Sequence, residues 1–178
     1  MSRRLFELAD GKGRDVLEVG GGVGALQIEL LRSGVERAVN VELSPAYEDA
    51  AADLLREAGL ASRVERRLLD FGRDASEVPA ADVVLMNRVV CCYPDMPSLV
   101  DAAAEHARRL LVLSYPPDTW LFRLATRMIN AWCRASRKEF RFFVHPPAAM
   151  FRVAAERGLE LAARERRSMW ELAALERA

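Results

Sequence analysis

A glycine-rich stretch near the start of the chain has the residue types and spacing of a ligand-binding turn. Residues 15–30 read DVLEVGGGVGALQIEL, with four glycines in the five positions 20–24. Between a strand and a helix, such glycines let the backbone approach a ligand closely, and the first helix N–H groups point toward it. No Gly-Lys-Ser/Thr sequence follows, so the stretch is not a phosphate-binding P-loop. It therefore predicts a site for a nucleotide-like ligand.

Two glutamates decide which ligand suits this turn. Gly20, Gly22 and Ala25 satisfy the dinucleotide pattern G-x-G-x-x-G/A, and Glu42 lies where an acid would bind a ribose. Glu18, however, lies two residues before Gly20, where a carboxylate would repel a pyrophosphate and favour a cationic ligand. Glu18 therefore favours a cationic ligand over a pyrophosphate.

Short β-rich runs alternate with helical patterns through the first two thirds of the chain. We expect strands over residues 15–20, 37–43, 64–71, 81–89 and 110–115, with helices over 23–32, 45–58 and 98–109. This alternation predicts βαβ units and a parallel sheet. Beyond residue 117 we expect helices over 118–138 and 147–157, then strands over 159–166 and 169–176 joined by a tight turn. A closing hairpin is foreign to a dehydrogenase half-domain.

The string E-x-G-x-G-x-G at Glu18–Gly24 resembles the first motif of class I S-adenosylmethionine-dependent methyltransferases. The resemblance covers nearly the whole chain from residue 15. It implies an α/β, Rossmann-like class I methyltransferase fold with a seven-stranded, mostly parallel sheet in the order 3-2-1-4-5-7-6. The C-terminal strands would form an antiparallel hairpin, and helices would cover both faces. Residues 1–178 would form a single methyltransferase domain with S-adenosylmethionine as cofactor.

The same resemblance implies which residues hold the cofactor. Glu42 matches the acid that binds the ribose hydroxyls, and Asp70 and Phe71 match the position that contacts adenine. Asn87 and Arg88 match the loop that lines the methionine end. The implied cofactor-binding set is Glu18, Gly20, Gly22, Gly24, Glu42, Leu43, Asp70, Phe71 and Asn87. The strings NRVVCCYPD and FVHPPAAM are also similar to small bacterial methyltransferases, a group that includes magnesium-protoporphyrin methyltransferases.

The segment from about 118 to 145 is a helical insertion that could form a substrate lid. Its apolar residues between Trp120 and Trp132 recur at helical spacing, and residues 119–141 contain six basic residues against one acid, Glu139. We expect the helix to roof the pocket, which favours a small apolar or aromatic acidic substrate. A helix packed on the sheet, a membrane-surface helix and a dimer contact are alternatives. The substrate-binding candidates are Tyr93, Trp120, Arg123, Arg127 and His145.

No residue is assigned firmly as a catalyst. Tyr93 and His145 are the candidates, and methylation of a carboxylate would need no general base. Cys91 and Cys92 are interpreted as small hydrophobic residues under the cofactor, and His106 as a surface residue. The expected function is S-adenosylmethionine-dependent methyl transfer to a small molecule. A non-catalytic cofactor-binding or regulatory domain is the second interpretation, and an NAD-dependent oxidoreductase is the third.

Composition excludes several other classes of protein. The 178 residues carry 26 basic and 26 acidic side chains, so net charge gives no case for nucleic-acid binding. No stretch approaches the roughly 20 apolar residues of a membrane span. Three cysteines and two histidines without metal-ligand spacing indicate no metal site and a reduced, cytoplasmic setting. A small-molecule substrate is the expected partner, and a homodimer is possible.

Overall fold

Seven strands form one sheet in the computed structural model, which describes residues 7–8, 11 and 13–178. The strand order is β3-β2-β1-β4-β5-β7-β6. All neighbouring pairs are parallel except those of β7, which runs antiparallel to both β5 and β6. The predicted fold class and strand order are therefore confirmed. The strands are β1 Asp15–Val19, β2 Arg37–Glu42, β3 Val64–Leu68, β4 Ala81–Asn87, β5 Ala107–Tyr115, β6 Leu159–Arg167 and β7 Trp170–Arg177.

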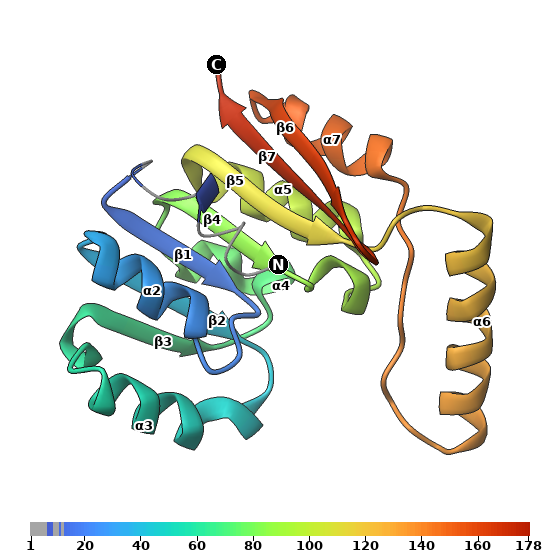
Figure 1. The fold of residues 1–178 in the computed structure, drawn as a ribbon, viewed down its shortest axis with the longest axis horizontal. Helices are drawn as coiled ribbons and strands as arrows, with labels where there is room; N and C mark the ends of the chain where they lie inside the picture. Colours follow the sequence, from blue (N-terminus) through green and yellow to red (C-terminus); the bar gives the residue numbers. More distant parts are fainter. Residues whose placement is uncertain (1–6, 9–10, 12) are drawn as a thin grey trace.

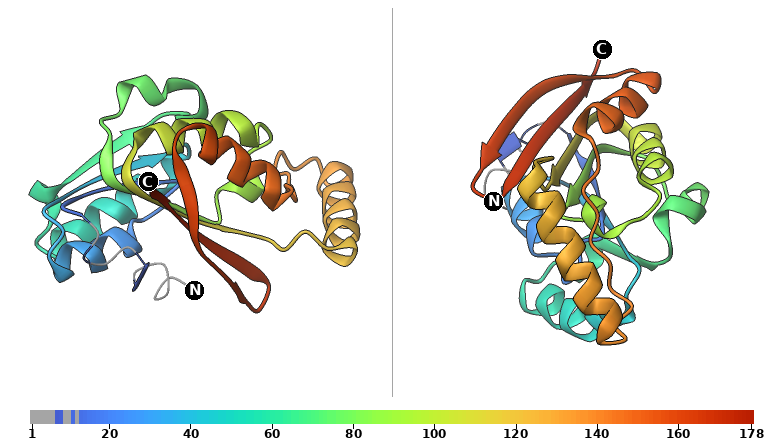
Figure 2. Two further views of the ribbon diagram at one scale, coloured as in Figure 1. Left: turned by 90° about the horizontal axis from the view of Figure 1, so that it is seen from above. Right: turned by 90° about the vertical axis from the view of Figure 1, so that its right-hand side faces the viewer.

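Helices cover both faces of this sheet (Figures 1 and 2). Leu26 and Leu55 anchor α2 and α3 to one face, and Leu99 and Met150 anchor α5 and α7 to the other. Helix α6 stands apart from both faces, beyond the carboxyl ends of the parallel strands (Figure 1). The helices are α2 Ala25–Ser33, α3 Glu48–Glu57, α4 Phe71–Asp74, α5 Met96–His106, α6 Trp120–Ala135 and α7 Pro147–Glu156, with short 3-10 turns η1 Pro45–Tyr47, η2 Ala61–Arg63, η3 Ala75–Glu77 and η4 Val90–Cys92.

Local sequence signals set where most helices begin. The Asp95 side chain accepts a hydrogen bond from the Ser98 amide, 3.2 Å away, at the start of α5. The Thr119 side chain does the same for the Phe122 amide at the start of α6. α2 instead follows Gly24, whose φ of 79° lies in the left-handed region that favours glycine. The glycine turn therefore directs the N-terminus of α2 toward the carboxyl edge of the sheet.

Most predicted boundaries shift by one to three residues in the structure, and two of these shifts change the environment of a residue discussed above. β3 ends at Leu68 rather than residue 71, because the Asp70 side chain caps α4 by accepting the Gly72 amide at 3.1 Å. Helix α5 ends at His106, and β5 begins at once with Ala107. The interpretation of His106 as a surface residue is wrong. Its ring is buried, and its two nitrogens lie 2.8 Å from the Ala102 carbonyl and 2.9 Å from the Ala75 carbonyl.

Helix α6 is mostly exposed and does not pack on the sheet (Figure 1). Only Thr126 and Cys133 of its sixteen residues are buried. Asn130 ties the helix to the loop that returns to the sheet, donating to the Phe142 carbonyl at 2.8 Å and accepting the Phe142 amide at 2.9 Å. The alternative of a helix packed on the sheet is therefore wrong.

Candidate functional site

The carboxyl ends of β1, β2, β3 and β4 surround one cavity of about 580 Å³. β1 lies between β2 and β4, where the strand order reverses direction, and ligands of open α/β sheets bind at such a switch point. The volume is within the usual range for a small-molecule site. Successive strand ends line it with Gly20 and Gly22, Glu42 and Leu43, and Asp70 and Phe71. Six of the nine sequence-predicted cofactor residues therefore meet in one place.

Glu42 connects the end of β2 to the glycine turn. Its Oε2 accepts the Gly22 amide at 2.8 Å, and its Oε1 accepts the amides of Leu43 and Ser44, each at 2.9 Å. The carboxylate is 8% exposed and lines the cavity. A carboxylate has about four lone-pair sites, so these three bonds leave it able to accept from a ligand hydroxyl.

Arg66 of β3 supports the turn from outside the cavity. Its guanidinium donates to the Gly22 carbonyl at 3.1 Å and pairs with Glu48 of α3 at 2.7 Å. The Gly20 amide donates to the Val41 carbonyl at 2.7 Å. The turn is therefore held in one conformation by β2, β3 and α3, which organises it for a ligand before any ligand binds.

Asp70 and Tyr93 form a hydrogen-bonded pair on the cavity wall. The Tyr93 hydroxyl donates to Asp70 Oδ1 at 2.7 Å. Burial and this hydrogen bond raise the pKa of Tyr93 to about 12, so the hydroxyl stays protonated near neutral pH. A Cβ atom at Gly72 would lie 2.3 Å from the Tyr93 hydroxyl, so only glycine fits there. Tyr93 is therefore suited to shaping the cavity and unsuited to removing a proton.

Glu18 lies behind the glycine turn rather than in the cavity. Leu17 and Val19 belong to the core beneath the cavity, whereas Val16 belongs to the core beneath α2. Because successive strand residues alternate between faces, Glu18 shares the α2 side with Val16. Its side chain is 3% exposed and packs under Gly21. Burial raises its pKa to about 8, although the Gln27 backbone and Arg66 both lower it.

Gly24 and Asn87 also lie outside the cavity lining. Gly24 directly precedes α2, and a Cβ atom there would lie 2.2 Å from the side-chain nitrogen Nε2 of Gln27. Asn87 Oδ1 accepts the Ser114 hydroxyl at 3.0 Å, and Ser114 Oγ in turn accepts the Arg88 amide at 2.9 Å. Asn87 therefore acts through Ser114 on the backbone of Arg88, which does line the cavity.

Arg88 has two unusual features. Its φ of 62° lies in the left-handed region, which is uncommon for a residue other than glycine. Its guanidinium carbon lies 5.0 Å from the centre of the Trp170 ring, in cation–π geometry. Among the ion pairs between described residues, none involves Arg88. Arg88, a residue of the cavity lining, therefore carries a positive charge that pairs with no described carboxylate.

The lid residues predicted from the sequence lie elsewhere. Trp120 and Arg127 are exposed on α6, and Arg123 pairs with Asp118, with Nε 2.5 Å from its carboxylate. None of the three lines the cavity, because α6 stands beyond the strand ends. The expectation that the helix roofs the pocket is therefore not met. The contribution of this segment to the cavity comes instead from Phe140, in the loop after α6.

The remaining residues discussed from the sequence are His145, Cys91 and Cys92. His145 Nε2 lies 3.0 Å from the Tyr93 carbonyl, and since a carbonyl only accepts, this nitrogen carries the proton. Burial lowers the pKa of His145, and its ring lies outside the cavity lining. Cys91 is buried, as expected of a small hydrophobic residue, but Cys92 is exposed and lines the cavity.

Sequence reasoning missed several lining residues. Ser44 and Tyr47 follow β2 directly, and a search of every strand's carboxyl end could have found them. Phe140 has no comparable signal, because it reaches the cavity only through the path of the return loop. The described His, Cys, Asp and Glu side chains form no group of three that could hold a metal ion. Within the same residues, no helix is long and apolar enough to cross a membrane.

Solved structures of methyltransferases share this architecture. Magnesium protoporphyrin IX methyltransferase from Synechocystis PCC 6803, solved with bound S-adenosylhomocysteine, superposes with a TM-score of 0.77 at 18% identity, over 99% of this chain and 80% of that one. An O-methyltransferase family protein from Burkholderia thailandensis gives 0.80 at 20% identity, over 100% of this chain and 55% of that one.

A third structure, geranyl diphosphate C-methyltransferase from Streptomyces coelicolor A3(2), gives a TM-score of 0.75 at 15% identity, over 99% of this chain and 76% of that one. At these identities the likeness establishes the fold. No curated protein sequence matches the chain significantly. The family model described as "Methyltransferase domain" matches residues 1–163. The chain therefore belongs to the methyltransferase-domain family and has the class I fold of S-adenosylmethionine-dependent methyltransferases.

Proposed function

We propose that this protein transfers a methyl group from S-adenosylmethionine to a small apolar or aromatic molecule that bears an acidic group. The observation that carries the cofactor proposal is the meeting of a glycine turn and a buried carboxylate, Glu42, in one partly apolar cavity. S-adenosylmethionine combines a nucleoside with a positively charged sulfonium and has no phosphate. The absence of P-loop residues from the turn suits such a ligand.

Each wall of the cavity would hold a different part of the cofactor. Glu42 would accept hydrogen bonds from the ribose hydroxyls, and Asp70 and Phe71 would contact the adenine. Gly20 and Gly22 would let the backbone approach the amino-acid end closely. When bound, the cofactor supplies an activated methyl group, so the protein's main tasks are to orient the acceptor and exclude water.

Glu42→Gln tests the cofactor proposal. The amide nitrogen of glutamine cannot accept hydrogen bonds, so it would face backbone N–H groups now bound by a carboxylate oxygen. We expect S-adenosylmethionine affinity measured by calorimetry to fall by about 10- to 150-fold, the equivalent of about 1.5–3 kcal/mol for hydrogen bonds to a charged group. Thermal unfolding of the variant controls for loss of the fold. Unchanged affinity in a folded variant would show that Glu42 does not bind the cofactor.

An acidic acceptor is supported by Arg88. Arg88 lines the cavity and has no carboxylate partner in the described part of the chain, and its guanidinium lies against Trp170. Arginine is suited to a carboxylate or phosphate because its planar fork can donate two parallel hydrogen bonds. One of the similar structures holds geranyl diphosphate, a molecule that joins an apolar chain to an acidic group. Carboxylate methylation would need no general base, which agrees with the protonated state of Tyr93 and the position of His145.

Arg88→Gln is expected to raise the KM for an acidic acceptor by about tenfold or more, since a hydrogen bond to a charged group is lost. Cofactor affinity should change little. Formation of S-adenosylhomocysteine with a panel of aromatic and aliphatic carboxylic acids provides the measurement. Arg123→Gln is the matched control, because Arg123 pairs with Asp118 outside the cavity. Equal effects of the two substitutions, or none from Arg88→Gln, would contradict this assignment of the acid-binding residue.

A further inference from the structure

Helix α6 presents an uncovered apolar face to its surroundings. The exposed fractions of six of its large apolar side chains run from 45% for Leu124 to 77% for Trp120. Large bare apolar patches are uncommon on soluble monomers and mark places where something else binds. The exposed apolar face of α6 consists of Trp120, Leu121, Leu124, Met128, Ile129 and Trp132.

The orientation of this face is set by contacts on the other side of the helix. Thr126 and Cys133 are buried, and both hydrogen-bonding groups of the Asn130 amide bind the backbone of Phe142. The Phe143 amide in turn donates to the Cys91 carbonyl at 2.7 Å, which ties the return loop to η4, the turn that follows β4. The structure therefore uses the less apolar side of α6 for its own packing and directs the exposed apolar face outward.

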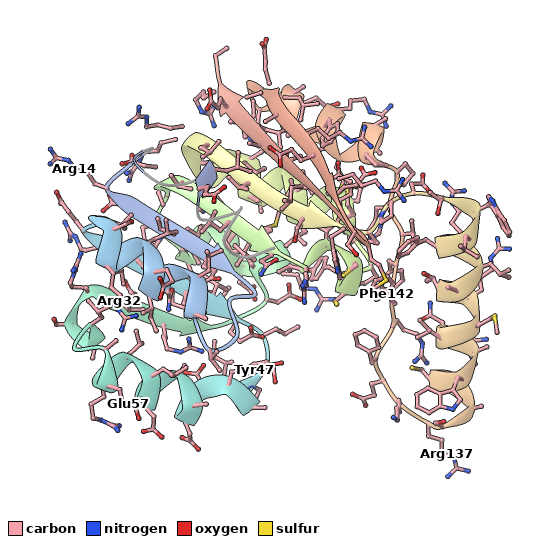
Figure 3. All side chains as sticks on the ribbon, viewed as in Figure 1. Arg14, Arg32, Tyr47, Glu57, Arg137 and Phe142 are labelled. Atoms are coloured by element: carbon pink, nitrogen blue, oxygen red, sulfur yellow. The ribbon has the colours of Figure 1, made fainter. Side chains whose placement is uncertain are left out.

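Charge decides between the possible occupants of this face. α6 contains no acidic residue, and residues 119–141 carry six basic side chains against Glu139 in a chain with zero net charge. Arg127 and Arg134 are exposed on the helix, and Arg137 lies at its far end and points away from the protein (Figure 3). A second copy of α6 would bring like charges together. An anionic surface would be attracted to them.

The two tryptophans add a separate indication. Trp120 and Trp132 lie near opposite ends of the exposed face, with exposed fractions of 77% and 60%. The Lys138 ammonium lies 4.3 Å from the centre of the Trp132 ring. Tryptophan is enriched where an apolar phase meets water, because its ring is apolar and its N–H group is polar. An apolar face with tryptophans, beside basic residues, is the pattern of a helix that lies in a membrane interface.

We propose that α6 docks this protein on anionic lipid membranes. The exposed apolar face enters the boundary between headgroups and acyl chains, and the neighbouring arginines contact lipid phosphates. Phe140, a few residues after α6, lines the cavity, so docking brings the cavity close to the lipid phase. This inference rests on α6 alone and holds whichever ligand the cavity binds.

Vesicle binding tests the proposal directly. Two of the three tryptophans of the chain lie on the exposed face, so docking should shift the tryptophan emission to shorter wavelength. We expect co-sedimentation with phosphatidylcholine vesicles that contain about 30 mol% phosphatidylglycerol, and binding at least about tenfold weaker to pure phosphatidylcholine. Raising the salt concentration should weaken the binding by screening. Absence of binding to the anionic vesicles would overturn the proposal.

A matched pair of variants locates the contact. Leu124→Glu on α6 and Leu161→Glu on β6 change side chains that are each 45% exposed. We expect Leu124→Glu to lose at least about tenfold in vesicle affinity and Leu161→Glu to bind like the wild type, because a buried charge in lipid is costly. Equal binding by both variants would refute docking through α6. So would a dimer, detected by light scattering, that Leu124→Glu dissociates, since the occupant would then be a second copy.

Discussion

Gly22→Val is expected to abolish detectable S-adenosylmethionine binding, with a loss of more than about 100-fold. The Cβ atom of this residue would project toward Tyr47, 3.9 Å away, and both residues line the cavity. A branched side chain would therefore occupy ligand space. Gly22 also has a φ of 54°, so the substitution should cost the fold about 1–2 kcal/mol of backbone strain. Calorimetry measures the affinity, and thermal unfolding measures the strain.

Gly59→Val provides the matched control. Gly59 follows α3 with a φ of 68°, and a Cβ atom there would meet nothing within 4 Å. It carries the same kind of backbone strain but lies outside the cavity lining. The control should lose similar stability and retain cofactor binding. If Gly22→Val still binds tightly, or if both variants lose binding equally, the ligand does not lie over the glycine turn.

The second large effect concerns Glu18 and the dependence of stability on pH. The folded-state pKa of Glu18 is raised from 4.5 to about 8 because the side chain is buried. Between those values the folded chain holds a proton that the unfolded chain releases, so stability falls as pH rises. Its contribution is fully present below about pH 4.5 and is lost as pH passes through 8. We expect the ligand-free protein to lose on the order of a few kcal/mol across this window.

Glu18→Gln removes the titrating group and should remove this slope. Urea unfolding at a series of pH values between 5 and 8 gives the free energy of unfolding for each protein. The variant should approach or exceed the wild type in stability at the upper end. Glu57→Gln, at an exposed position at the end of α3 (Figure 3), reports the effect of the same substitution on the surface. Parallel curves for Glu18→Gln and wild type would show that Glu18 is ionised in the folded protein.

The acidic acceptor and the lipid surface are proposed to bind different arginines of this chain. Arg88 lines the cavity and lies against Trp170, whereas Arg127 and Arg134 lie on α6. Substitutions in the first place should change acceptor kinetics, and substitutions in the second should change vesicle binding. The two proposals can therefore fail independently of each other.

The sequence, together with the family that its motif resembles, predicted the strand order, five of the six described helices and the residues at three strand ends. Strand and helix patterns arise from neighbouring residues, and the motif at Glu18–Gly24 identified the family that supplied the topology. Glu42 and Asp70 could be predicted because Glu42 ends β2 and Asp70 lies two residues after β3, and the carboxyl ends of parallel strands meet at one edge. Local spacing and a shared edge therefore predict the cavity wall that we propose for the cofactor.

Only the tertiary structure decided which way the remaining side chains face. Glu18 stands in the motif but points to the α2 side, because strand alternation gives two faces and only packing decides which one meets the cavity. The apolar stripe of α6 was visible in the sequence, yet the helix packs through Thr126, Asn130 and Cys133 and leaves the stripe exposed. The position of α6 beyond the strand ends excludes Arg123, and the path of the return loop brings in Phe140 (Figure 1). These outcomes depend on contacts between distant segments, which spacing along the chain does not encode.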